Sequence, residues 1–136
     1  MNDRPTAAEL VEGVRRFLEA DLLPTLTDPR LRFQTLIAAN VLAIAGRELS
    51  SEEDLLREEH ELLTAILAKT DPPPQRLAEL REAVREANRQ LCERIRGGDF
   101  EGAERFRALA AMLRRLVVRK LEVANPRYLA GAVKPR

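Results

Sequence analysis

The fold is decided by residues 29–49, PRLRFQTLIAANVLAIAGREL. An α-helix turns by about 100° per residue, and at that step the large apolar side chains of this segment point nearly all round the helix axis. These side chains are Leu31, Phe33, Leu36, Ile37, Val41, Leu42 and Ile44. A helix that is apolar on most sides is normally buried, so we expect this one to lie at the centre of a bundle of helices.

Capping signals mark where the first two helices begin. Thr6 and Glu9 have the spacing of a capping box, in which each side chain accepts a hydrogen bond from the other residue's backbone N–H. Asp28 is suited to cap the central helix, because it precedes Pro29, and proline is tolerated at the first helical position. Both helices are therefore expected to begin at well-defined residues.

Breakers and further caps divide the rest of the chain. Ser50-Ser51 is expected to cap a separate third helix, and Asp71-Pro-Pro-Pro74 is a stiff connector. Gly97-Gly98 is a strong stop, because glycine adopts the left-handed C-terminal conformation without a Cβ clash. Five helices are expected, over about residues 7–23, 29–49, 52–69, 75–96 and 100–123.

Length and composition limit the architecture. A chain of 136 residues has room for one domain and not for two independent cores. It is rich in Ala, Leu, Glu and Arg and has only four Phe and one Tyr, which favours helix over strand. We predict an all-α, single-domain bundle of about five helices over residues 1–123, with an extended C-terminal tail over residues 124–136.

The balance of charge gives little reason to expect nucleic acid or a membrane as a partner. The formal net charge is +1, and there is no Trp to stack on bases. The longest apolar stretch, residues 36–45, is short and contains Asn40, so it cannot span a bilayer. With one cysteine and no signal-peptide pattern at the N-terminus, the sequence predicts a cytoplasmic protein.

The residue types that usually carry catalysis are scarce. His60 is the only histidine and Cys92 the only cysteine, and no spacing indicates a nucleophile, a metal site or a phosphate-binding loop. We predict no catalytic residue, no metal ligand and no cofactor, with His60 at or near the surface and Cys92 as a small buried hydrophobe. An enzyme with an unrecognised site that uses His60 or Cys92 remains a third hypothesis.

Six residues near the C-terminal end form a candidate interface or anion-binding site. Four arginines of the expected last helix fall within about 140° of one another, opposite its apolar stripe. Such a face is often only solvated, but it also suits an anionic ligand or an acidic partner. An Arg-Tyr pair follows in the tail, where it either packs on the core or joins an interface. The six are Arg107, Arg114, Arg115, Arg119, Arg127 and Tyr128.

Asn40 and Arg47 are the candidate buried polar residues. Asn40 lies inside the apolar arc of the central helix, and Arg47 shares that face two turns later. A buried amide without a partner costs about 1–3 kcal/mol, so Asn40 needs one. Either Asn40 forms a structural hydrogen bond that fixes the register of the helix, or it belongs to the polar lining of a pocket or an interface.

Several stretches of the chain resemble a family of small bacterial helical proteins that is still described as a domain of unknown function. They are RPTAAEL at 4–10, LRF at 31–33 and AANVL at 38–42 followed by REL at 47–49, LCERIRG at 91–97, and KLEVANPRYL at 120–129. Members are typically encoded beside an aminoglycoside-phosphotransferase-like kinase and an acyl-CoA dehydrogenase. The chain departs from the usual pattern at Gly46, where the family has a larger residue, and in its longer connector at 71–74.

The resemblance implies a role in the catabolism of hydroxylated acids. The chain looks like the accessory subunit of a kinase that phosphorylates 4-hydroxyacyl-CoA in levulinic-acid-type pathways. The first hypothesis is therefore a non-catalytic partner of a phosphotransferase-fold kinase, and the alternative is a stand-alone binding protein for acyl-CoA or another anionic small molecule. The central helix has more apolar surface than a five-helix monomer obviously hides, which leaves a homodimer open.

Overall fold

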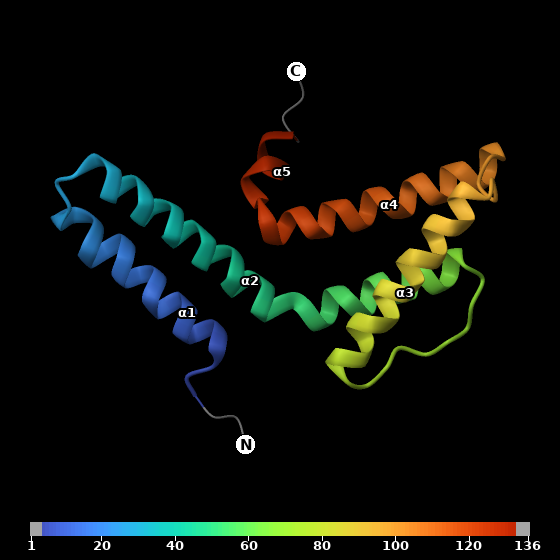
Figure 1. The fold of residues 1–136 in the computed structure, drawn as a ribbon, viewed down its shortest axis with the longest axis horizontal. Coiled ribbons are helices and arrows are strands. Elements are labelled where there is room, and N and C mark those ends of the chain that lie inside the picture. The colour runs from blue at the N-terminus through green and yellow to red at the C-terminus, as the bar shows by residue number, and fades with distance from the viewer. Residues whose placement is uncertain (1–3, 133–136) are drawn as a thin grey trace. The chain divides into compact units, whose positions relative to one another are not determined.

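The structure is a computed structural model that describes residues 4–132, with the backbone alone at Ala132. Within this range every regular element is a helix, so the all-α class is confirmed (Figure 1). The elements are α1 (Ala7–Arg16), the π-helical turn η1 (Phe17–Leu22), the 3-10 turn η2 (Leu23–Thr25), α2 (Pro29–Ile66), α3 (Leu77–Arg96), α4 (Ala103–Ala124) and α5 (Pro126–Ala132).

The predicted helix starts are confirmed by their hydrogen bonds. Thr6 Oγ1 accepts from the Glu9 backbone N–H at 3.2 Å, while the Thr6 backbone N–H donates to Glu9 Oε2 at 2.7 Å. The carboxylate of Asp28 accepts from the backbone N–H of Arg30 at 2.8 Å at the start of α2. These contacts satisfy backbone donors that the first turn of a helix leaves without a partner.

The second and third expected helices are one continuous helix, α2, so the predicted break at Ser50-Ser51 is wrong. Ser50 Oγ donates to the Gly46 carbonyl at 2.9 Å, and Ser51 Oγ donates to the Arg47 carbonyl at 2.7 Å. A serine that bonds back to the carbonyl four residues earlier can remain inside a helix instead of starting a new one.

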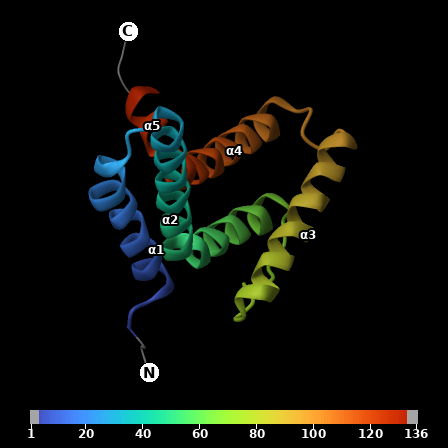
Figure 2. The ribbon, with the colours of Figure 1, turned by 60° about the vertical axis from the view of Figure 1, so that its left-hand side comes forward.

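The described residues divide into two compact units. Unit 1 holds α1 and its following turns, α2 up to Ser51, and Val123–Asn125. Here α1 lies beside the first half of α2 and runs antiparallel to it, as Figure 1 and Figure 2 both show. The Arg32 guanidinium donates to the carbonyl of Leu23 at 2.8 Å and thereby ties the connecting turn to α2.

Unit 1 buries little of its apolar surface. Ala39 is its only fully buried hydrophobic residue among those the structure describes. Leu31, Leu36 and Val41 of the segment expected at the centre of the bundle are exposed. The expectation that this segment is buried on most sides therefore fails for the chain alone, since α1 covers only one side of it.

Unit 2 contains the hydrophobic core and comprises Glu52–Glu122 with the chain from Pro126 onward. The core side chains come from the second half of α2 and the turn after it, from α3, from the turn after α3 and from α4. They are Leu63, Leu67, Leu80, Val84, Ala87, Leu91, Phe100, Leu109, Met112 and Leu116. Those of α3 and α4 are spaced by three and four residues, as expected for helices packed along one face.

The C-terminal end of the chain differs from the expected extended tail. Residues Pro126–Ala132 form the helix α5, and residues 133–136 of the predicted tail lie outside the described part of the chain. Proline is accommodated at the start of α5 because the first backbone N–H of a helix has no intrahelical acceptor. The stop after α3 is confirmed, and Gly98 has the left-handed φ of +86° that an L side chain rarely adopts.

None of the helices within residues 4–132 combines the length and apolar character needed to cross a lipid bilayer.

Candidate functional site

The clearest candidate site is a stripe of exposed apolar side chains along α4, formed by Phe106, Leu113 and Val117. Their spacings of seven and four residues place them within about 40° of one another on the helix. They are between 39% and 62% exposed. The stripe lies roughly 90° round α4 from the side chains that α4 contributes to the core. One helix thus carries two apolar stripes, only one of which the unit buries. We call the exposed one the α4 stripe.

Arg107 and Arg114 flank the α4 stripe. They lie at about 80–100° from Phe106 on the helix, on the side away from the core. Both are exposed, and neither has a hydrogen bond or an ion pair within residues 4–132. The α4 stripe and these two guanidinium groups together form an apolar surface with a cationic edge.

Arg115 and Arg119 form ion pairs within unit 2. Arg115 Nε donates to Glu58 Oε1 at 2.7 Å, and Arg119 Nε donates to Glu58 Oε2 at 2.9 Å. The bonds from Arg115 and then Arg119 hold the pKa of the Glu58 carboxyl below its ordinary value, because they favour its charged form. The structure therefore separates the four predicted arginines into two that bind Glu58 and two that do not.

Arg127 and Tyr128, the other predicted interface residues, lie on α5 in unit 2. Both are exposed, Tyr128 strongly so. They belong to a helix and not to the extended segment that the sequence predicted. Their part in any interface remains a prediction.

The candidate buried polar pair has two different environments. Arg47 is half-buried, and its Nε donates to the Val123 carbonyl at 2.7 Å within unit 1. Asn40, in contrast, is exposed, so the prediction that it is buried is wrong for the chain alone. The physical reason is that its apolar neighbours Phe33 and Leu36 are exposed as well, so this part of the α2 surface is not packed against the other described residues of unit 1.

A buried polar cluster in unit 2 was not predicted. Glu59 is only 7% exposed, and its Oε1 accepts from Asn88 Nδ2 at 2.9 Å and from Lys120 Nζ at 3.1 Å. One carboxylate thus joins α2, α3 and α4. The partners are 29 and 61 residues away in sequence, so only the tertiary fold brings them together.

The predicted environments of His60 and Cys92 are both wrong, because His60 is buried and Cys92 is exposed. His60 is 4% exposed and its Nδ1 has no hydrogen-bond partner among the described residues, whereas Cys92 is exposed. The spacing of His60 to Leu56 and Leu63 places it on the core side of α2, and this helical pattern could have revealed its burial. No group of three or more metal-binding side chains gathers anywhere in residues 4–132.

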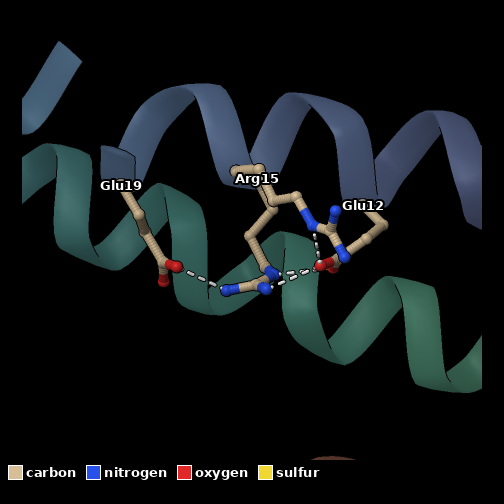
Figure 3. A network of polar contacts seen from close by, with 4 residues as sticks. Glu12, Arg15 and Glu19 are labelled. Carbon is tan, nitrogen blue, oxygen red and sulfur yellow. Dashed lines mark hydrogen bonds and ion pairs between the residues drawn. The ribbon is translucent and has the colours of Figure 1, made fainter. Parts of the chain in front are cut away.

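The charged side chains of α1 neutralise one another. Arg15 lies between Glu12 and Glu19 and donates from Nε and Nη2 to the two oxygens of Glu12, each at 2.7 Å (Figure 3). The bonds from Arg15 and then Arg16 lower the pKa of the Glu12 carboxyl to about 2. These acids are held by arginines three or four residues away along α1 and η1, so they stabilise this helical segment and do not form an open cation site.

Comparison with known proteins identifies the family of the chain. No curated protein and no solved structure matches the sequence. One family model matches residues 24–128, which include α2, α3, α4 and the start of α5. The chain therefore belongs to the family described as Domain of unknown function (DUF6285).

Proposed function

We propose that this chain is a non-catalytic accessory subunit of a phosphotransferase-fold kinase that acts on hydroxyacyl-CoA in acid catabolism. The kinase and its substrate class come from the resemblance of residues 4–10, 31–33, 38–42, 47–49, 91–97 and 120–129 to proteins encoded beside such kinases. The structural observation in favour of a protein partner is the α4 stripe with its two unpaired arginines.

The α4 stripe has the composition of a binding surface. Aromatic residues and arginine are enriched at protein interfaces, and a few of them usually supply most of the binding free energy. Covering a half-exposed Phe, Leu or Val side chain contributes about 1 kcal/mol each. Phe106, Leu113 and Val117 together provide a small apolar centre for an interface.

The arginines beside the stripe add specificity for negative charge. A guanidinium can bind a carboxylate or a phosphate through two parallel hydrogen bonds. Arg107 and Arg114 are available for this purpose, whereas Arg115 and Arg119 already bind Glu58. An acidic surface on the kinase, or the phosphates of its bound CoA substrate, would complement them.

Co-expression with the kinase encoded beside this chain tests the proposal. The kinase should co-purify with the wild-type chain and should be recovered in lower soluble yield without it. Val117→Glu should abolish co-purification, because it buries a charge in the α4 stripe. Ile95→Glu is the matched control, since Ile95 is an exposed apolar residue of α3, and this variant should still co-purify. A kinase that is equally soluble and active without the chain would contradict the proposal.

The second candidate function is a stand-alone binding protein for acyl-CoA or another anionic small molecule. The exposed pair Arg107 and Arg114 favours it, since two unpaired cations lie beside an apolar stripe. Calorimetry of the isolated chain with a CoA ester separates the two functions. Binding without any kinase, lost in Arg107→Glu/Arg114→Glu, supports the stand-alone role, and absence of heat at high ligand concentration contradicts it.

A further inference from the structure

The first half of α2 presents a second unoccupied apolar surface, in unit 1 and separate from the α4 stripe. Its large side chains are between 48% and 64% exposed. They are Leu31, Phe33, Leu36, Ile37 and Val41. All but Leu31 lie within about 140° of one another on the helix. We call these four residues, together with Asn40 between them, the α2 arc.

The α2 arc faces away from α1. The side of α2 that α1 covers consists of small residues: Ala39 is buried, and a Cβ placed on Gly46 would lie 3.7 Å from Val11 Cγ1. Ala39 and Gly46 are about 140° round the helix from the middle of the arc. Over residues 33–41, α2 therefore has one side that α1 covers and one exposed apolar side.

We propose that the α2 arc is the contact between two copies of this chain, whose α2 helices pack antiparallel about a two-fold axis close to Asn40. Two-fold symmetry brings each residue near the axis opposite itself, so the two Asn40 amides would meet. An amide has both donors and an acceptor and can pair with an identical amide. A single asparagine in an apolar helix interface is a known means of fixing register.

Charges at the two ends of the arc fit this arrangement. Arg30 and Glu48 are 18 residues apart, which is five helical turns, so they lie on the same edge of α2. Residues 30 and 48 are symmetric about residue 39, next to Asn40. In an antiparallel pair, Arg30 of each copy therefore meets Glu48 of the other, which forms two ion pairs. Neither residue has an ion pair within the described part of the chain.

The same charges favour the antiparallel arrangement. In a parallel pair, Arg30 of each copy would lie level with residue 30 of the other copy and five helical turns from the other copy's Glu48, so neither ion pair would form. The apolar residues agree with the antiparallel choice, because Ile37 and Val41 are also symmetric about residue 39 and would contact each other across the axis. The register of the two α2 helices and their antiparallel direction thus follow from the same symmetry about residue 39.

The apolar area available is close to what a stable dimer needs. Leu10 and Val14 of α1 and Phe17 at the start of η1 are also about half exposed and lie on one stripe of that helical segment. Together with the apolar side chains of α2, they offer roughly 700 Å² per chain, compared with about 800 Å² per partner in a standard interface. Two hairpins packed in this way form a four-helix bundle.

Sedimentation and light scattering of the purified full-length chain test the proposal. The expected mass is twice the 15.4 kDa of one chain. Ile37→Glu should give a monomer with unchanged helicity, while Leu113→Glu in the α4 stripe should remain a dimer. This control also separates the dimer from the proposed kinase interface, because loss of one contact should leave the other intact.

An exchange of charges tests the register even if Ile37→Glu fails to fold. Arg30→Glu alone and Glu48→Arg alone should each raise the dimer dissociation constant about fivefold or more, since two ion pairs become like-charge contacts. The double variant should restore the wild-type dissociation constant. A wild-type monomer at all concentrations overturns the proposal. So does a dimer that is insensitive to Ile37→Glu and to the charge exchange, or a kinase complex in which a monomeric chain covers Ile37.

Discussion

Arg119 Nε donates a hydrogen bond to Glu58 Oε2 at 2.9 Å, across 61 positions of the sequence. This contact joins α4 to the second half of α2 inside unit 2. It also removes one of the four α4 arginines from the set available to an anion, because its guanidinium already binds a carboxylate. The candidate anion-binding surface of α4 therefore holds fewer available arginines than its sequence suggests.

The stability of unit 2 should fall in acid partly through Glu58. Its pKa is lowered from 4.5 in the folded chain, so the folded state favours the ionised carboxylate. The resulting stabilisation is fully present above pH 4.5 and is lost as the pH falls below it. Glu58→Gln should lower stability at pH 7 by less than about 1 kcal/mol and reduce the loss of stability between pH 5 and about pH 3. Urea unfolding at several pH values measures this. Parallel pH profiles for variant and wild type would contradict it.

Leu63 should be essential to the core of unit 2. Its side chain is fully buried, and Leu63→Ala should destabilise the chain by about 2–5 kcal/mol through lost burial and the cavity left behind. Leu113→Ala is the matched control, because Leu113 is exposed in the α4 stripe, and it should cost less than about 1 kcal/mol. Chemical denaturation followed by circular dichroism gives both values. Equal effects of the two substitutions would show that the core is assigned wrongly.

His60 should be dispensable for folding. Its imidazole is buried with an unpaired Nδ1, and an unsatisfied buried polar atom costs about 1–3 kcal/mol. His60→Leu replaces it with an apolar side chain of similar size and should leave stability unchanged or raise it by up to about 2 kcal/mol. His60→Ala, which leaves a cavity, should lower it. A loss of more than about 1 kcal/mol in His60→Leu would mean that Nδ1 has a partner, and loss of kinase stimulation with the fold intact would give His60 a functional role.

Replacing Ala68, which follows the end of α2, with glycine should stabilise the folded chain. Its φ of +55° lies in the left-handed region, which costs an L residue about 1–2 kcal/mol. Glycine avoids this strain but loses about 0.5–1 kcal/mol through its freedom in the unfolded chain. Ala68→Gly should therefore raise stability by up to about 1 kcal/mol. Ala65→Gly, within the regular helix, should lower it by about 1 kcal/mol. Thermal unfolding distinguishes the two, and a destabilising Ala68→Gly would contradict the assigned backbone conformation.

Local chemistry made the helix boundaries predictable. The capping box at Thr6, the cap at Asp28 and the stop at Gly98 involve residues within three positions of each other, so the sequence alone contains the whole interaction. Ser50 and Ser51 were misjudged because a serine hydroxyl can either cap a new helix or bond back to the carbonyl four residues earlier. The sequence does not distinguish these two choices.

Long-range pairing and burial were harder to predict. The pairing of Glu58 with Arg119 and of Glu59 with Asn88 depends on helices that meet only in the folded unit. The helical wheel correctly placed Asn40 inside an apolar arc, but an arc is buried only when something covers it. None of the described residues of unit 1 covers Asn40, which is therefore exposed. The proposed second copy would supply the missing cover.

The most direct test of the account is the rate at which the proposed partner, a phosphotransferase-fold kinase, phosphorylates a hydroxyacyl-CoA, measured alone and with this chain titrated in. The account predicts that the rate rises until the two proteins are equimolar, that Val117→Glu removes the increase, and that this chain alone produces no phosphorylated product. A kinase whose rate does not depend on the chain, or turnover of the substrate by the chain in isolation, would contradict it.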